Sequence, residues 1–133
     1  MRFLLDTCVI SDFTEGHPKV YERILALSPT DLAVSVITEM ELAYGLFLNA
    51  RIAERIKPII DRFFREIRVL SFDRDTVEVT ANLRAKQKRR GRPVGAYDAL
   101  IAGTALAHGL LLVTSNTREF SQIEDLLIDN WRL

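Results

Sequence analysis

Four acidic residues stand where the hydrophobic pattern predicts a strand end, an apolar helix face or the first turn of a helix: Asp6, Glu41, Asp98 and Glu119. Asp6 follows three apolar residues in FLLDTCVI, and a buried unpaired carboxylate needs a partner or a shifted pKa. Carboxylates that converge repel one another unless a cation lies among them, and oxygen ligands without nearby His or Cys suit Mg²⁺ or Mn²⁺. The chemistry indicated is that of a divalent metal site.

Three of these acids also have purely structural interpretations. Asp6 could cap a helix that begins near Thr7. Asp98 lies in the first turn of AYDALIAGTALAHG, where a negative charge complements the helix dipole. Glu119 follows a predicted strand in TSNTREF and could be a solvated loop residue. Because ligands gather at the carboxyl ends of parallel strands, Asp6 and Glu119 are also placed for a shared site.

Glu41 has its own alternative, since TEME could form a capping box with Thr38 as the cap. The helical register favours another interpretation, in which Glu41 lies on a single apolar stripe with its neighbours at helical spacing, Ile37, Tyr44 and Leu48. Glu39 points elsewhere and serves as an internal control. We therefore expect Glu41 on a buried face, where a lone acid needs a cation.

The elements that must position these acids are short apolar strands alternating with helices. The predicted strands comprise residues 2–5, 32–36, 68–72, 110–115 and 126–129, and the predicted helices residues 17–27, 37–50, 51–67, 75–91 and 96–109. Pro58 predicts a kink or break, and Asp75 with Glu78 a capping box. The strands are continuously apolar, which is typical of a sheet covered on both faces. We predict one α/β domain over residues 1–133, a three-layer α/β/α sandwich on a mainly parallel sheet of about five strands.

Composition excludes several classes of protein. Lys+Arg and Asp+Glu both number 18, so net charge alone does not indicate a polyanionic partner. The chain has one cysteine and two histidines, which makes a disulfide impossible within the chain and a His/Cys zinc site improbable. No run approaches the roughly 20 apolar residues of a membrane span, and MRFLLDTCVISDF does not fit a signal peptide. We expect a cytoplasmic protein without membrane contact.

One segment, RAKQKRRGR at residues 84–92, concentrates positive charge just ahead of Asp98. It could simply complement the dipole at a helix C-terminus. Six cations in nine residues exceed what capping requires. Contact with an RNA backbone is therefore the second interpretation, through Lys88, Arg89, Arg90 and Arg92.

These segments, in this order and across essentially the whole chain, resemble the PIN-domain family. FLLDT resembles the opening strand with the first acid, and SVITEMELAYG the second motif. GRPVGAYDALIAGTALAHGLLLVTSNTREF resembles the third and fourth motifs, and LLIDNW the ending. Within the family, the chain is most similar to VapC-type toxins of bacterial type II toxin–antitoxin pairs.

The resemblance implies a Mg²⁺- or Mn²⁺-dependent endoribonuclease that cleaves RNA phosphodiester bonds with metal-activated water. It implies Asp6, Glu41 and Asp98 as catalytic metal-binding acids with Glu119 as the fourth, and Thr7, Thr114, Ser115 and Asn116 as polar residues that order the site. The family commonly has Asn where this chain has Cys8, a weaker hydrogen-bond partner for Asp6. The implied partners are an RNA substrate, a small antitoxin whose tail occupies the active-site groove, and a second copy in a homodimer.

Other enzyme classes fit less well. A haloacid-dehalogenase-like phosphatase needs an Asp where Cys8 stands, and a response-regulator receiver needs an early acid pair and a late Lys. No glycine-rich phosphate loop is present. A non-catalytic PIN-like module that binds RNA or protein is the remaining alternative, which the four intact acids disfavour. The identity of the RNA, the antitoxin and the number of metal ions stay open.

Overall fold

Five parallel strands form the central sheet of the computed structural model, which describes residues 1–133. They are β1 (Phe3–Leu5), β2 (Leu32–Ser35), β3 (Arg68–Leu70), β4 (Leu111–Val113) and β5 (Ile128–Asp129). Their order across the sheet is β3-β2-β1-β4-β5, and every neighbouring pair is parallel. The predicted α/β class and parallel sheet are confirmed, and the carboxyl ends of β1 and β4 lie side by side.

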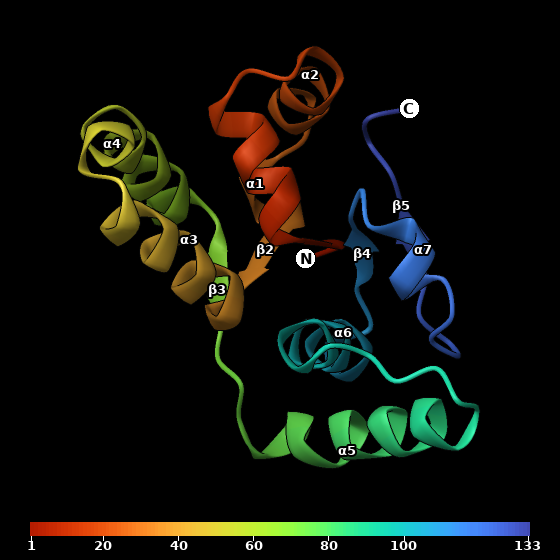
Figure 1. Cartoon of the computed structure of the whole chain (residues 1–133). Helices are drawn as coiled ribbons and strands as arrows, with labels where there is room; N and C mark the ends of the chain where they lie inside the picture. Colours follow the sequence, from red (N-terminus) through yellow and green to blue (C-terminus); the bar gives the residue numbers. More distant parts are fainter.

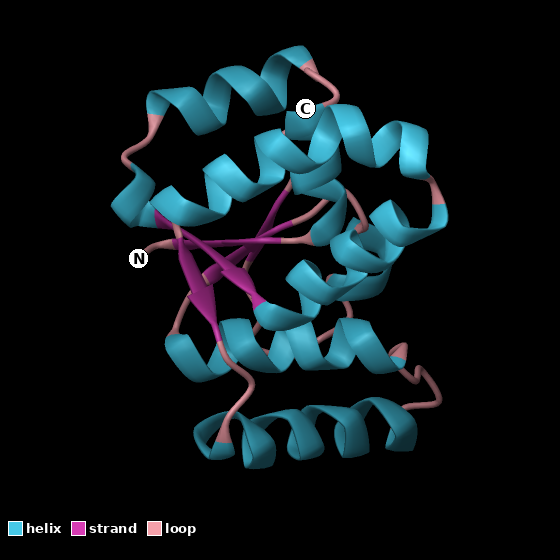
Figure 2. Ribbon diagram, turned by 90° about the vertical axis from the view of Figure 1, so that its left-hand side faces the viewer, coloured by secondary structure: helices cyan, strands magenta, loops and turns pink.

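Seven helices surround the sheet: α1 (Thr7–Thr14), α2 (Pro18–Ala26), α3 (Val36–Leu48), α4 (Ala50–Glu66), α5 (Arg74–Arg89), α6 (Ala96–His108) and α7 (Thr117–Phe120), with a 3₁₀ turn at Pro29–Asp31. In Figure 1, α1 and α2 lie on one side of the strands and α5 and α6 on the other, while α3 and α4 form a hairpin at the β3 edge. Figure 2 shows the strands enclosed between helices, which is the predicted three-layer arrangement. No helix combines the length and apolar character needed to cross a membrane.

Alternate residues of β1 enter two separate cores. Leu4 packs toward α6, where Ile101 and Ala102 are fully buried. Phe3 and Leu5 point to the opposite face, in the core cluster that includes Ile10 and Trp131. Because side chains alternate across a strand and both faces are covered, every residue of β1 is apolar and buried. The carboxyl end of β1 is therefore fixed in position by the packed cores on both faces of the sheet.

The predicted capping box of α5 is wrong, and the break that was one of the two predictions at Pro58 does not occur. The cap of α5 is Asp73, which accepts a hydrogen bond from the Asp75 amide at 3.1 Å, so α5 begins before the predicted box of Asp75 and Glu78. Helix α4 runs without a break through Pro58. Its buried apolar residues, Ile56 before the proline and Ile60 and Phe63 after it, form one packed face, which offsets the hydrogen bond that proline cannot donate.

Candidate active site

Asp6 lies directly after β1 and is only 6% exposed. Its Oδ1 accepts a hydrogen bond from the Thr7 amide at 2.8 Å, which caps α1. Its Oδ2 accepts one from the Thr114 hydroxyl at 2.7 Å, at the end of the neighbouring strand β4. The capping role predicted for Asp6 is confirmed through Oδ1, and it is compatible with the predicted site role because Oδ2 faces the end of β4.

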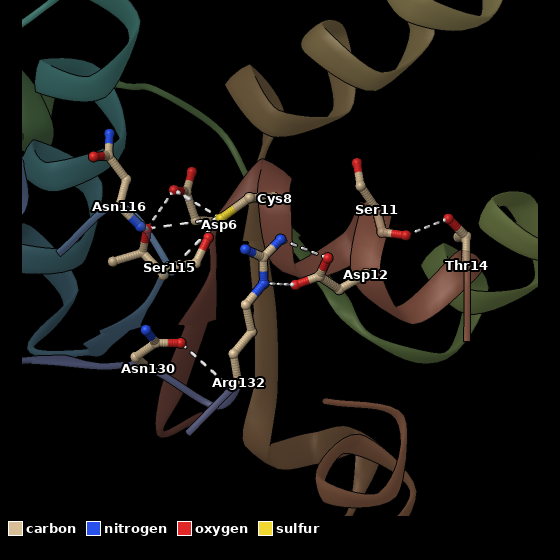
Figure 3. Close-up of polar contacts among 10 residues, drawn as sticks. Asp6, Cys8, Ser11, Asp12, Thr14, Ser115, Asn116, Asn130 and Arg132 are labelled. Atoms are coloured by element: carbon tan, nitrogen blue, oxygen red, sulfur yellow. Dashed lines mark hydrogen bonds and ion pairs between the residues drawn. The ribbon is translucent and has the colours of Figure 1, made fainter. Parts of the chain in front are cut away.

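Cys8 occupies the position that is commonly Asn in the family, and its thiol still reaches the site (Figure 3). Cys8 Sγ lies 3.6 Å from Asp6 Oδ2 and accepts a hydrogen bond from the Ser115 amide at 3.4 Å. The contact with Asp6 that Cys8 placed in doubt is retained in a weaker form. The Cys8 thiol thus contacts both Asp6, directly after β1, and Ser115, shortly after β4.

Glu41 reaches the site from α3. The cap of α3 is Ser35, which accepts a hydrogen bond from the Ile37 amide at 3.0 Å, so the alternative capping box of Thr38 and Glu41 is wrong. The Thr7 hydroxyl donates to Glu41 Oε1 at 2.7 Å, and Thr38 Oγ1 lies 3.3 Å from the same hydroxyl. Thr7 therefore links Glu41 to the start of α1, immediately beside Asp6.

The prediction that the face of α3 carrying Glu41 is buried is wrong for the residues that follow Glu41. Tyr44 is 63% exposed and Leu48 is 69% exposed, because the C-terminal half of α3 extends past the core. Glu41 itself is half-buried, whereas Glu39 is exposed. The distinction between the two glutamates therefore holds, although an exposed apolar helix end replaces the buried face.

Asp98 and Glu119 form a pair at the start of α6. Gly95 caps α6, and its amide donates to Glu119 Oε1 at 3.0 Å, while the Asn116 side-chain amide donates to Oε2 at 3.1 Å. These bonds, led by the one from Gly95, lower the pKa of Glu119. The neighbouring Asp98 carboxyl also lowers the pKa of Glu119, and Glu119 in turn raises the pKa of Asp98.

The electrostatics of Asp98 connect all four acids. Burial, followed by the contact with Glu119 and the negative charges of Glu119, Asp6 and Glu41, together raise the pKa of Asp98 to about 7. None of the four acids is in an ion pair; the chain's salt bridges use Asp12, Glu15, Asp61 and Glu124 instead. The structure thus brings the predicted acids into one negatively charged neighbourhood.

The donor chemistry of this neighbourhood fits a hard divalent cation. Carboxylate oxygens predominate, hydroxyl and amide groups of Thr7, Thr114 and Asn116 hold three of the carboxylates, and no Lys or Arg neutralises them. No three His, Cys, Asp or Glu side chains form a ready-made metal cluster in this arrangement. The acids are neighbours and their negative charges interact, but no three of them converge as the ligands of one ion would.

The predicted RNA-contacting basic residues divide into two groups. Arg90 Nη2 binds Glu124 Oε2 at 3.0 Å, and Lys86 Nζ lies 3.7 Å from the same oxygen. Lys88 does not take part in an ion pair, nor do Arg89 and Arg92, and Arg89 and Arg92 are exposed. Arg90 thus ties α5 to the segment after α7, which favours a structural role for that residue.

Several contributing residues escaped sequence reasoning. Gly95 acts through its backbone amide, and Thr38 through a contact with Thr7 that only the folded chain creates. Arg132 donates from Nε to Asp12 Oδ2 at 2.6 Å and from Nη2 to Oδ1 at 2.8 Å, fixing the end of the chain to α1 (Figure 3). Of these residues, only Gly95 could have been suspected from the sequence, because it directly precedes the helix that carries Asp98.

The PIN domain family matches residues 3–126 of the sequence, and the chain belongs to that family. The chain is 35% identical over 131 residues to the tRNA(fMet)-specific endonuclease VapC of Shigella flexneri, with 98% of each protein covered. It is 30% identical to Ribonuclease VapC2 of Rickettsia felis, again over 98% of each protein.

Solved structures agree with the sequence comparison. The chain superposes on the structure of DNA-bound VapBC from Salmonella typhimurium with a TM-score of 0.89 and 34% identity, covering 98% of each chain. It superposes on VapBC2 from Rickettsia felis, bound to a promoter DNA fragment, with a TM-score of 0.88 and 30% identity, covering 98% and 99% of the two chains. The resemblance to VapC-type proteins is confirmed over the whole chain.

Proposed function

We propose that this chain is a Mg²⁺- or Mn²⁺-dependent endoribonuclease and the toxin of a toxin–antitoxin pair. The observation that carries the proposal is the gathering of Asp6, Glu41, Asp98 and Glu119 without a basic partner, in a chain 35% identical to a VapC endonuclease. Asp6 and Asp98 would hold the ion most directly, with Glu41 and Glu119 completing the ligand set or orienting water. Such an ion supplies the activation of water and the neutralisation of phosphate charge.

The chain's own residues would orient and protect this site. Thr114 and the Thr7 amide fix both oxygens of Asp6, and Thr7 fixes Glu41 through its hydroxyl. Gly95 and Asn116 donate to the two oxygens of Glu119 and favour its ionised form, and the charge of Glu119 favours the protonated form of Asp98. A cation bound among the acids would favour the ionised form of Asp98, because a positive charge opposes the negative charges that raise its pKa.

Incubating purified, partner-free protein with total RNA and Mg²⁺ or Mn²⁺ tests the proposal. New 5′ ends are mapped by sequencing, with an EDTA control and an Asp98→Asn control. Because the Shigella flexneri relative carries tRNA(fMet) in its name, that RNA is the first defined substrate to test. Cleavage that needs the ion and Asp98 supports the proposal. RNA binding without cleavage supports the non-catalytic module instead.

Metal binding has a readout independent of cleavage. A ligand that binds the native state alone raises the melting temperature with its concentration. Mn²⁺ or Mg²⁺ should therefore stabilise the wild-type chain and stabilise Asp98→Asn much less. Equal stabilisation of both would place the ion elsewhere.

We propose the groove between α3 and α4 as the place where an apolar segment of the antitoxin binds. This groove has a cavity of about 500 Å³ with nine hydrophobic residues among its 12 lining residues, including Met40, Leu46 and Phe47. Phe47 is 91% exposed, and an exposed apolar surface of this kind is typical of a protein-binding site. Ala43→Asp should abolish co-purification with the coexpressed antitoxin, whereas Val77→Asp, on exposed α5, should not. Homodimer formation, measurable by light scattering, stays a prediction.

A further inference from the structure

A small cavity lies beside Glu119, between the α5–α6 connection and α7. It has a volume of about 270 Å³ and is lined by Pro93, Val94, Asn116, Arg118, Glu119 and Gln122. Drug-sized ligand sites start at about 300 Å³, so this cavity suits one flat ring system rather than a larger ligand. Asn116 and Glu119 line the cavity and also belong to the acid site, so the cavity is next to that site.

The walls of this cavity combine an apolar surface with unused polar groups. Pro93 and Val94 supply the apolar surface. Gln122 donates its side-chain amide to the Arg118 carbonyl at 2.9 Å, which leaves Gln122 Oε1 as a free acceptor. Asn116 likewise uses its amide NH₂ on Glu119, leaving its own carbonyl oxygen.

The charge of the lining argues against a simple anion site. Arg118 and Glu119 are its two charged residues, and they carry opposite signs. Arg118 is exposed and takes part in no salt bridge, so its guanidinium is free to donate to a ligand. The cavity thus offers two carbonyl acceptors, one donor group and an apolar wall around a space that is neutral overall.

We infer that this cavity binds one unstacked base of the RNA strand, next to the phosphate held at the acids, and that it prefers a base with an exocyclic amino group. Proteins read single-stranded RNA by receiving a splayed base on an apolar surface and bonding its edge. The free oxygens of Gln122 and Asn116 accept from an amino group, and Arg118 donates to a ring nitrogen or carbonyl. Guanine, adenine and cytosine satisfy this pattern, whereas uracil carries a carbonyl where the amino group is needed. The inference rests on the proposed ribonuclease function.

Cleavage of an RNA randomised around the cut site tests the inference. The wild-type chain should disfavour uracil at one position beside the cut by about tenfold, the value expected for one good base contact. Gln122→Met keeps the length of the side chain and removes its carbonyl. It should flatten this preference toward unity and raise KM, with kcat nearly unchanged. Arg118→Ala should weaken binding of all four bases.

A neighbouring variant separates recognition from a loss of structure. Ser121 also bonds the Arg118 carbonyl, at 3.5 Å, but does not line the cavity. Ser121→Ala should therefore leave the base profile unchanged. If the wild-type chain cleaves RNA without a preference at any flanking position, or Gln122→Met keeps the wild-type profile, the base site is refuted and the nuclease stands. If the wild-type chain cuts no RNA, the nuclease proposal fails and takes the base site with it.

Discussion

Thr114 donates its hydroxyl to Asp6 Oδ2 at 2.7 Å, although 108 residues separate the two in the sequence. Strands β1 and β4 are paired in parallel with Leu5 opposite Val113, so the next residue of each strand reaches the same sheet edge. The backbone N–H of Asn116 donates to Thr114 Oγ1 at 3.0 Å. This bond leaves the hydroxyl proton of Thr114 to point toward Asp6. Thr114 is thus a positioning residue for a buried carboxylate.

Removing this hydroxyl should be costly. Thr114→Ala leaves Asp6 short of one donor while it remains buried, which should lower the free energy of unfolding by about 1–3 kcal/mol and reduce cleavage. Thr114→Ser should restore both, since it keeps the hydroxyl. Thr30→Ala, at an exposed threonine, should change stability by less than about 0.5 kcal/mol. Urea unfolding measures all three, and equal effects at positions 30 and 114 would contradict the positioning role.

Replacing either central acid should separate activity from folding. Asp6→Asn and Asp98→Asn should each abolish metal-dependent cleavage. Asp98→Asn should also stabilise the metal-free chain above pH 7, because it removes a charge that Glu119, Asp6 and Glu41 oppose. Circular dichroism and RNA cleavage assays check the two effects. Full activity in both variants would rule out the proposed metal site.

The stability of the metal-free chain should fall as pH rises from about 4 to 7. Asp98 has an ordinary pKa of 3.8 in the unfolded chain and about 7 when folded, so the folded chain binds the extra proton across this range. Stability falls with rising pH wherever the native state holds more protons than the unfolded state, so this contribution is fully present below about pH 4 and is lost once the pH exceeds about 7. Urea titrations in EDTA measure the slope. Asp98→Asn should remove it, and a slope that survives in the variant would assign it to another group.

The two glutamates at the start of α3 should behave differently. Glu41 accepts a hydrogen bond from Thr7 at 2.7 Å, whereas Glu39 is exposed and lines the α3–α4 groove. Glu41→Gln should therefore lose most cleavage activity, and Glu39→Gln should retain it. Both variants should melt within a few degrees of the wild type. Similar kcat losses in both would contradict the assigned role of Glu41.

Within residues 84–92, the arginines without an ion pair should affect RNA binding, and Arg90, which has one, should affect stability. If Arg89 and Arg92 contact phosphates, changing both to Gln should reduce the slope of log affinity against log salt by roughly 0.7 per lost contact. Arg90→Gln breaks the pair with Glu124 and should cost about 0.2–1 kcal/mol of stability with little change in RNA affinity. A salt titration and a thermal melt distinguish them. An unchanged salt slope in the double variant would move the RNA-binding surface elsewhere.

The sequence alone determined the class of fold and the parallel sheet, and it singled out four acids as candidates. Short apolar runs such as FLL and LLLV, alternating with longer helical patterns, are typical of strands covered on both faces, so the layered fold follows from local pattern. Asp6 was recognisable because a charge directly after such a run conflicts with burial. Helix boundaries shifted by a few residues at α5, where Asp73 competed with Asp75 for the cap.

Only the tertiary structure decided how the acids are held. Whether Thr38 caps α3 or contacts Thr7, whether Tyr44 is buried, and whether Arg90 meets RNA or Glu124 all depend on segments distant in sequence. Hydrogen bonds and desolvation act over a few ångströms, so local periodicity does not encode them. The raised pKa of Asp98 is the clearest case, since its burial and the charges of Glu119, Asp6 and Glu41 coincide only after the chain has folded.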